Sequence, residues 1–123
     1  MPNNPVSWFE IYVQDMERAK RFYETVFQCK LGKLNNPYLE LWGFPMDVNG
    51  YGVSGALVRM EGCVSGGGGT LVYFRCTDCA ESAAWAEAAG GRISKPKMAI
   101  GQYGFISLVV DTEGNMIGLH SMQ

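Results

Sequence analysis

The feature that most constrains this chain is a repeated order of predicted elements. Residues 6–14 alternate apolar and polar side chains, as a half-buried strand does, and residues 16–27 follow with an apolar stripe at helical spacing. Asp15 stands between them and suits the N-cap of the helix. A strand pattern at 70–76 and a helical pattern after Asp78 repeat this order. The repeat predicts two similar modules.

Each half continues with three shorter extended segments, so each half is predicted to be a βαβββ module. A half of this size cannot bury both faces of its sheet alone, and we therefore expect the modules to pack together. The predicted class is α+β: two βαβββ modules form a curved mixed sheet around a cavity, with the helices on the outer face. The further predicted strands span 31–34, 38–44, 52–60, 92–95, 105–111 and 115–122.

A glycine-rich stretch separates the two halves. The chain, 1–123, has the length of a single domain, in which we predict a first module at 1–62 and a second at 69–123. Residues 63–68 hold most of the run SGGGG, which lacks the GK[ST] ending and the strand-to-helix position of a phosphate-binding loop. We interpret this stretch as a flexible linker.

The composition argues against several classes of function. A net charge of -2 gives no basic surface for nucleic acid or for an anionic membrane. No apolar run is long enough to span a bilayer, and the N-terminal residues lack the basic and apolar regions of a signal peptide. The expected location is therefore the cytoplasm, with neither nucleic acid nor a membrane as partner.

The four cysteines are expected to be reduced thiols in that compartment. Cys76 and Cys79 have the CxxC spacing of redox and zinc motifs. Such a role needs a thioredoxin-like context or a second pair of ligands, and the sequence has neither. We predict a structural role for both.

A binding site is expected on the concave face, away from the helices. The apolar positions of the first strand must face the helix, so the alternate positions face the other way. Overlaying the halves pairs Gly55 with Gly118 and Leu57 with His120, the single histidine. A register slip of one residue would reverse these faces. The predicted concave-face residues are Trp8, Glu10, Tyr12, Leu57, Leu71, Tyr73, Arg75, Gly118, His120 and Met122.

The runs FEIYVQDMERAKRFYETVF and VVDTEGNMIGLH, on paired βαβββ modules, resemble the vicinal oxygen chelate superfamily. This group includes glyoxalase I, extradiol dioxygenases, and fosfomycin- and bleomycin-resistance proteins. The resemblance implies the fold, a ligand cavity and metal ligands on inner strand faces. The matching positions here are Trp8, Leu71, Gly55 and Gly118, whose side chains cannot bind a metal. No metal cofactor is therefore expected.

The chain looks more like the bleomycin-resistance branch, which implies a homodimer that holds a ligand in aromatic-lined grooves. We therefore predict a metal-independent protein that binds an aromatic or amphipathic small molecule. The predicted ligand-binding residues are Trp8, Tyr12, Trp42, Phe44, Leu57, Tyr73, Arg75 and Tyr103, with Tyr51 as a further aromatic candidate.

Two enzymatic alternatives remain open. One is a glyoxalase-type lyase, isomerase or dioxygenase with an off-pattern divalent metal at Glu10 and His120. The other is a metal-free enzyme that uses Glu10 or His120 as catalytic base beside Arg75. Each residue also has a structural alternative: His120 as a hydrogen-bonded strand histidine, and Glu10 with Arg75 as a salt bridge or a solvated rim.

Overall fold

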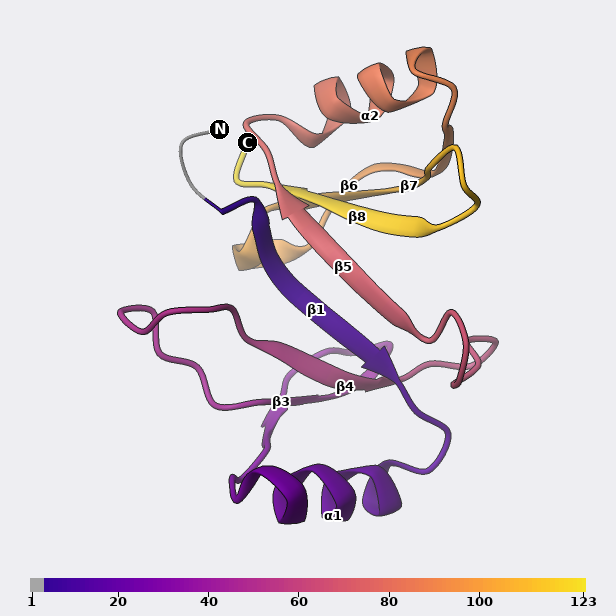
Figure 1. The fold of residues 1–123 in the computed structure, drawn as a ribbon. Helices are drawn as coiled ribbons and strands as arrows, with labels where there is room; N and C mark the ends of the chain where they lie inside the picture. The colour runs from indigo at the N-terminus through magenta and orange to yellow at the C-terminus, as the bar shows by residue number, and fades with distance from the viewer. Residues whose placement is uncertain (1–3) are drawn as a thin grey trace. The chain divides into compact units, whose positions relative to one another are not determined.

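The computed structural model describes residues 4–123, which form two α-helices, eight strands and one 3-10 helix. The order β-α-β-β-β occurs twice (Figure 1), so the predicted α+β class and the two βαβββ modules are confirmed. The elements are β1 (Val6–Tyr12), α1 (Met16–Phe27), β2 (Gly32–Leu34), β3 (Glu40–Gly43), β4 (Gly55–Arg59), β5 (Thr70–Arg75), α2 (Cys79–Ala88), β6 (Arg92–Ala99), η1 (Gly101–Tyr103), β7 (Phe105–Val110) and β8 (Met116–Ser121).

The described chain divides into two compact units. The N-terminal unit is Trp8–Thr70, and the C-terminal unit joins residues 4–7 to Leu71–Gln123. The predicted linker, 63–68, lies inside the N-terminal unit, close to its end. Residues 1–3 of the predicted first module lie outside the described residues. The organisation as a single domain stays a prediction.

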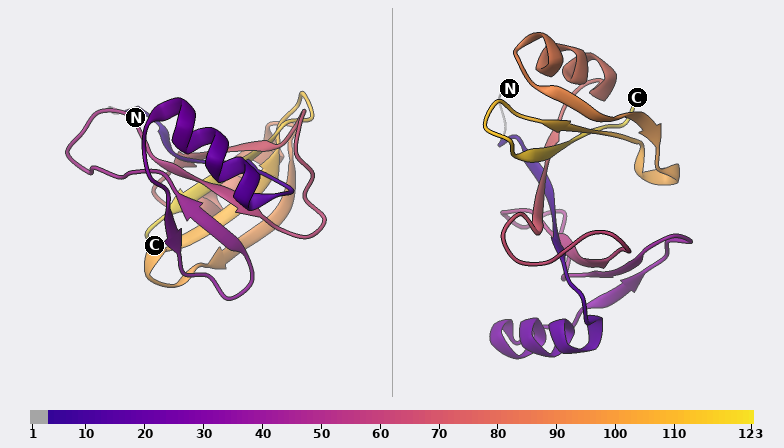
Figure 2. Two further views of the ribbon diagram at one scale, coloured as in Figure 1. Left: turned by 90° about the horizontal axis from the view of Figure 1, so that it is seen from below. Right: turned by 90° about the vertical axis from the view of Figure 1, so that its right-hand side faces the viewer.

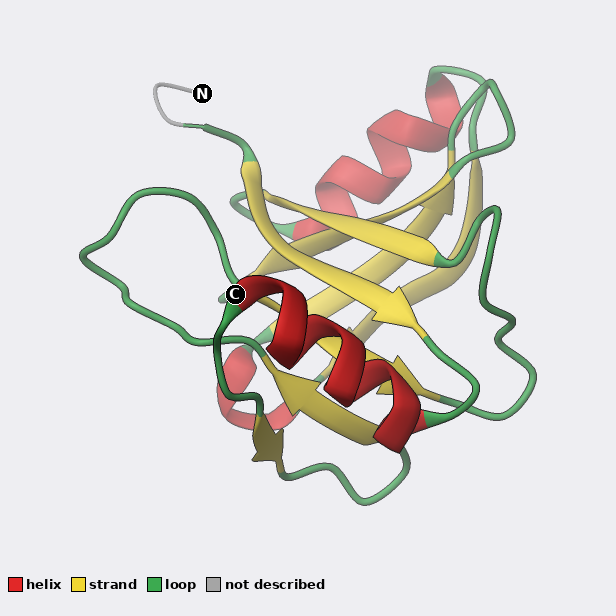
Figure 3. Ribbon diagram, turned by 60° about the horizontal axis from the view of Figure 1, so that its bottom comes forward, coloured by secondary structure: helices red, strands yellow, loops and turns green. Residues whose placement is uncertain are grey.

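In the N-terminal unit, α1 covers one face of a four-stranded mixed sheet (Figure 3). The strand order is β2-β3-β4-β1, with β1 parallel to β4 and the other pairs antiparallel. The Asp15 side chain accepts a hydrogen bond from the backbone N–H of Arg18 at 3.1 Å, which caps the first turn of α1. The buried cluster between α1 and the sheet contains Val13, Met16, Leu31 and Leu57.

In the C-terminal unit, α2 packs on the four strands of that unit (Figure 2). The order is β5-β8-β7-β6, and β5 and β8 are the parallel pair. Asp78 caps α2 by accepting from the N–H of Ala80 at 2.9 Å. The buried cluster beneath α2 contains Cys79, Ala83, Val109 and Leu119. In each unit we call the sheet face away from its own helix the open face.

The last strand of the N-terminal unit and that of the C-terminal unit differ in register. Ile11, which packs against the α1 cluster, pairs with Leu57. In β8, Leu119 belongs to the α2 cluster, so its neighbour His120 turns to the open face. The expectation that Leu57 and His120 share a face is therefore wrong, because β4 is shifted by one residue relative to the overlay.

No helix within residues 4–123 is both long and apolar enough to cross a membrane.

Candidate functional site

The open face of β1 presents a carboxyl group between two aromatic side chains. The Glu10 carboxylate accepts a hydrogen bond from the Tyr12 hydroxyl at 2.9 Å and one from Trp8 Nε1 at 3.3 Å. These residues share a face because they alternate along one strand. All three are partly buried. The sequence predicted that these three side chains lie on the face of β1 opposite Phe9 and Ile11. The hydrogen bonds between them agree with that prediction.

The environment of Glu10 favours its neutral form. Burial raises the pKa of this carboxyl above its ordinary value, and the hydrogen bonds from Tyr12 and Trp8 oppose that rise only in part. A carboxyl group with a raised pKa can exchange a proton closer to neutral pH than a free glutamate does. Glu10 is therefore suited both to binding a donor group and to proton transfer.

Three predicted ligand-binding residues do not lie on that face. Leu57 has no exposed surface and lies in the core cluster beneath α1, and Trp42 and Phe44 pack against the same cluster. Trp42 pairs with Leu57 across the β3–β4 ladder, which puts both on the α1 side. The expected concave placement of all three is corrected.

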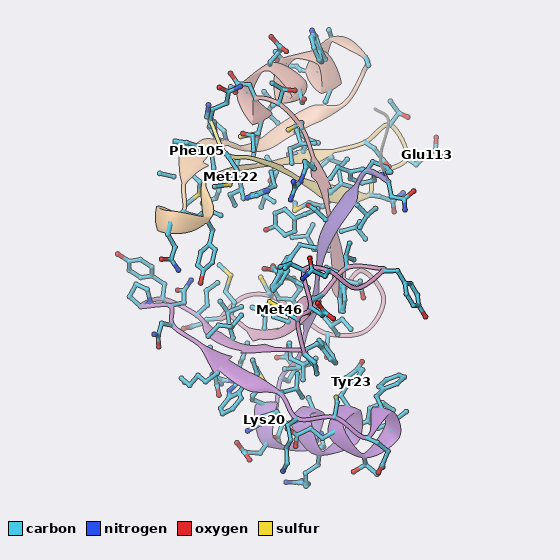
Figure 4. The ribbon with its side chains drawn as sticks, turned by 90° about the vertical axis from the view of Figure 1, so that its left-hand side faces the viewer. Lys20, Tyr23, Met46, Phe105, Glu113 and Met122 are labelled. Carbon is cyan, nitrogen blue, oxygen red and sulfur yellow. The ribbon has the colours of Figure 1, made fainter. Side chains whose placement is uncertain are left out.

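Trp42 is held by contacts that belong to the packing of α1. The ammonium group of Lys20, labelled in Figure 4, lies 3.3 Å from the centroid of the indole ring. The indole Nε1 donates to Glu40 at 3.1 Å. A cation over the ring and a carboxylate at its edge match the charge distribution of an indole.

His120 is fixed by the turn before β7. Its Nε2 lies 2.6 Å from the carbonyl oxygen of Tyr103, the last residue of η1. A carbonyl oxygen only accepts, so Nε2 carries the proton and Nδ1 of the neutral ring keeps a lone pair. His120 is thus a hydrogen-bonded strand histidine and also retains a nitrogen that can accept a proton. Tyr103 contributes its backbone to this arrangement.

Arg75 lies beside His120 in the β5–β8 register and is exposed. Its backbone N–H donates to the carbonyl of Pro5 at 2.8 Å. Within the described part of the C-terminal unit, the ion pair is Lys97 with Asp78, at 3.0 Å, and Arg75 forms none. The guanidinium group is therefore available to an anionic group from solvent.

Tyr73 occupies the space beside Gly118 on the open face of the C-terminal unit. Tyr73 is buried and pairs with Gly118, and a Cβ atom added to that glycine would overlap the tyrosine ring. The position that the resemblance matches to a metal ligand thus has no room for a side chain. Packing of the Tyr73 ring therefore explains why no metal-ligating side chain stands at this position.

The donor set does not fit the metal that the superfamily resemblance implies. Gly55 pairs with Phe9 on the α1 side, so it does not lie on the open face at all. Among residues 4–123, no three or more His, Cys, Asp or Glu side chains are grouped where they could hold an ion. Metal independence stays a prediction, and no step of the chemistry is assigned to a metal.

Cys76 and Cys79 have packing contacts that suit a structural role. Burial raises the pKa of the Cys76 thiol, which favours its less reactive protonated form, and its Sγ lies 3.4 Å from the carbonyl oxygen of His120. Cys79 is fully buried beneath α2. Both are free thiols.

The sequence interpretation missed a cavity of about 380 Å³ in the N-terminal unit, on the α1 side of the sheet. Four of the residues around it are aromatic. The apolar spacing of Phe9, Tyr23 and Phe27 had indicated core packing, and Phe44 had been predicted as a ligand contact on the concave face, so the sequence held no signal for a hollow here. We call this cavity the α1 pocket; it is lined by Phe9, Ile11, Tyr23, Phe27, Phe44, Pro45, Val53 and Ser54.

Residues 6–119 match the sequence model of the Glyoxalase/Bleomycin resistance protein/Dioxygenase superfamily. The chain belongs to this superfamily. The match covers both βαβββ modules and confirms the resemblance drawn from the two sequence runs. Membership of this superfamily does not by itself define an activity, because sites on one fold differ in chemistry.

Solved structures share the fold at low sequence identity, which shows the fold alone. Methylmalonyl-CoA epimerase from Mycobacterium tuberculosis is 16% identical, over 97% of this chain and 88% of that chain, with a TM-score of 0.68. A hypothetical protein from Bacillus halodurans is 10% identical, over 96% and 94%, with a TM-score of 0.71. A methylmalonyl-CoA epimerase variant from Streptomyces coelicolor, in complex with 2-nitronate-propionyl-CoA, is 15% identical, over 96% and 94%, with a TM-score of 0.66. A search of curated protein sequences gave no match.

Proposed function

We propose that this superfamily member binds a small aromatic or amphipathic molecule on the open face of β1. The observation that carries the proposal is the Glu10 carboxylate, which accepts hydrogen bonds from both Trp8 and Tyr12. A carboxyl group flanked by two aromatic rings offers a hydrogen-bond acceptor and flat apolar surface at one place. A planar ligand with an N–H or O–H group matches that combination.

The Glu10 carboxylate has acceptor capacity beyond its two protein donors. An ionised carboxylate offers about four lone-pair sites, and Trp8 and Tyr12 use one each. A ligand donor that reaches Glu10 would also offset the cost of burying the charge. A ligand that donates to Glu10 would therefore bind here with higher affinity than one held by apolar contact alone.

Binding without a metal ion is part of the proposal. It is supported by the residues at three positions that match metal ligands of the superfamily. Trp8 and Leu71 offer no donor suited to a divalent metal, and Gly118 has no side chain. Stoichiometric binding of zinc, nickel, manganese or ferrous iron to stripped protein, abolished by His120→Ala, would contradict it.

We further propose that the protein acts as a homodimer in the cytoplasm. Phe22 and Val26 project from α1 with more than half of their surface exposed, and exposed apolar side chains of this kind are often covered by a partner. Sedimentation equilibrium measures this directly. A monomer at all concentrations would contradict the dimer and leave the ligand proposal untouched.

A metal-free enzyme is the second candidate, and two observations favour it. Burial raises the pKa of Glu10, and the Tyr103 carbonyl holds His120 in the tautomer that keeps a lone pair on Nδ1. Each group can therefore accept a proton in its own unit. An enzyme of this kind should lose turnover in Glu10→Gln or His120→Ala while most ligand affinity remains.

Calorimetric titration with a panel of planar compounds tests the binding proposal. The panel includes a propionyl-CoA derivative, because the Streptomyces epimerase structure contains one. We expect Trp8→Ala to weaken binding by about tenfold or more. Trp85→Ala is the matched control, since Trp85 is an exposed tryptophan on α2. Equal affinities for the two variants would contradict the proposed face.

A further inference from the structure

The α1 pocket is open to solvent, and one of its walls is formed by aromatic rings that contact one another. The Phe9 and Phe44 ring centroids are 5.5 Å apart at 41°, and Tyr23 meets Phe44 edge-on at 5.6 Å. Tyr23, labelled in Figure 4, also stacks with Phe27 at 6.2 Å. Rings from β1, from α1 and from the residue after β3 therefore form one continuous apolar wall.

The floor and one side of this pocket are held in place by specific contacts. Gly55 has no Cβ, and a Cβ there would overlap Phe9, so the glycine lets the Phe9 ring lie against β4. The Ser54 hydroxyl donates to the carbonyl oxygens of Phe44 and Pro45, at 3.2 and 3.1 Å. The pocket is thus preformed, which lowers the entropic cost of binding.

The lining selects a ligand by charge and size. None of the residues that line the pocket is charged, and the Ser54 hydroxyl is already engaged, so an ionic group held against the rings would find no counter-charge. A volume of about 380 Å³ lies in the range of small-molecule sites and is too small for a folded partner. These properties match a neutral aromatic compound of one or two rings.

We propose that the α1 pocket is a second binding site, specific for small neutral aromatic molecules. It is separate from the site proposed above, because Phe9 and Ile11 alternate with Trp8 and Glu10 and face the other side of β1. Phe44, which the sequence had suggested as a ligand contact on the concave face, contributes to this pocket instead.

The test uses 2-naphthol as a neutral probe and naphthalene-2-sulfonate as its charged counterpart. Binding is measured by calorimetry and by ligand NOEs to the methyl groups of Ile11 and Val53. Val53→Phe places a ring in the pocket and, at a residue already 45% exposed, leaves the core intact. Val48→Phe is the matched control: the same change in the same loop, at a residue 96% exposed and outside the pocket.

We expect 2-naphthol to bind with NOEs to Ile11 and Val53, and the sulfonate to bind at least about tenfold more weakly. Val53→Phe should weaken by about tenfold or more the naphthol binding that gives the NOE to Ile11, whereas Val48→Phe should leave that binding unchanged. Naphthol that binds without an NOE to Ile11, or that keeps this NOE and its affinity in Val53→Phe, would overturn the proposal. So would no saturation up to about 1 mM. A dimer dissociated by Val53→Phe would also overturn it, because the pocket would then receive a second copy of the chain.

Discussion

The two units share one topology, and each has a glycine in the last strand of its parallel pair. The partner side chain packs over this glycine on opposite faces of the sheet in the two units. In the N-terminal unit Gly55 lies against Phe9 on the α1 side. In the C-terminal unit Gly118 lies against Tyr73 on the open side. A shift of one residue in β4 separates the two cases and reverses every side chain of that strand. The open face therefore holds a histidine in the second unit and none at the equivalent place in the first.

The largest expected effect distinguishes the aligned residues Leu57 and His120. Leu57→Ala should lower the free energy of unfolding by about 2–5 kcal/mol, because it leaves a cavity beneath α1. His120→Ala should cost about 1 kcal/mol, the net worth of one hydrogen bond. Urea denaturation measures both, with the exposed Val48→Ala as control. Equal losses for Leu57 and His120 would contradict the different faces.

The next effect concerns the two glycines. Gly55→Ala and Gly118→Ala should each cost about 1–3 kcal/mol through overpacking. The contacts differ in kind: the three atoms nearest to a Cβ at Gly118 all belong to the Tyr73 ring, whereas the atom nearest to one at Gly55 is the backbone oxygen of Phe9.

Double-mutant cycles sharpen this contrast. Tyr73→Ala should relieve the cost of Gly118→Ala, whereas a Phe9→Ala change should not relieve Gly55→Ala, since the carbonyl remains. Relief of both glycine substitutions, measured by urea denaturation, would show that ring contact alone decides the two sites.

A smaller effect depends on pH and belongs to the N-terminal unit. The folded pKa of Glu10 is raised above its ordinary value of 4.5 by burial. Its contribution to stability is therefore complete below the unfolded pKa and is lost as pH rises through the folded pKa. Relative to Glu10→Gln, the wild type should lose stability as the pH rises from below the ordinary value of 4.5 through the raised folded pKa of Glu10. Guanidinium denaturation across this range measures the difference, and a constant difference would contradict the raised pKa.

The smallest effect is spectroscopic and belongs to the C-terminal unit. The Tyr103 carbonyl should hold neutral His120 as the Nε2–H tautomer, which ¹⁵N shifts of the ring report directly. Gly101→Pro should alter η1 and weaken this preference, because its φ of 70° is closed to proline. A majority of the Nδ1–H tautomer in the wild type would contradict the assigned hydrogen bond.

Local patterns were sufficient for the elements and for the face of β1. Asp15 and Asp78 cap the predicted helices, and Trp8, Glu10 and Tyr12 share the predicted face with hydrogen bonds between them. These features depend on neighbours within a few residues, so the sequence carries them directly. The placement of Trp42, Phe44 and Leu57 failed because it needed the register of a strand distant in sequence.

The sequence by itself determined the order of elements, both helix caps and the membership of the superfamily. Only the tertiary structure decided that Leu57 is core, that the Tyr103 carbonyl orients His120 and that aromatic side chains line the α1 pocket. The physical reason is the separation along the chain of the residues that interact. Alternation and capping arise between residues close in the chain, whereas register, turn-to-strand hydrogen bonds and cavities arise between segments that meet only after folding.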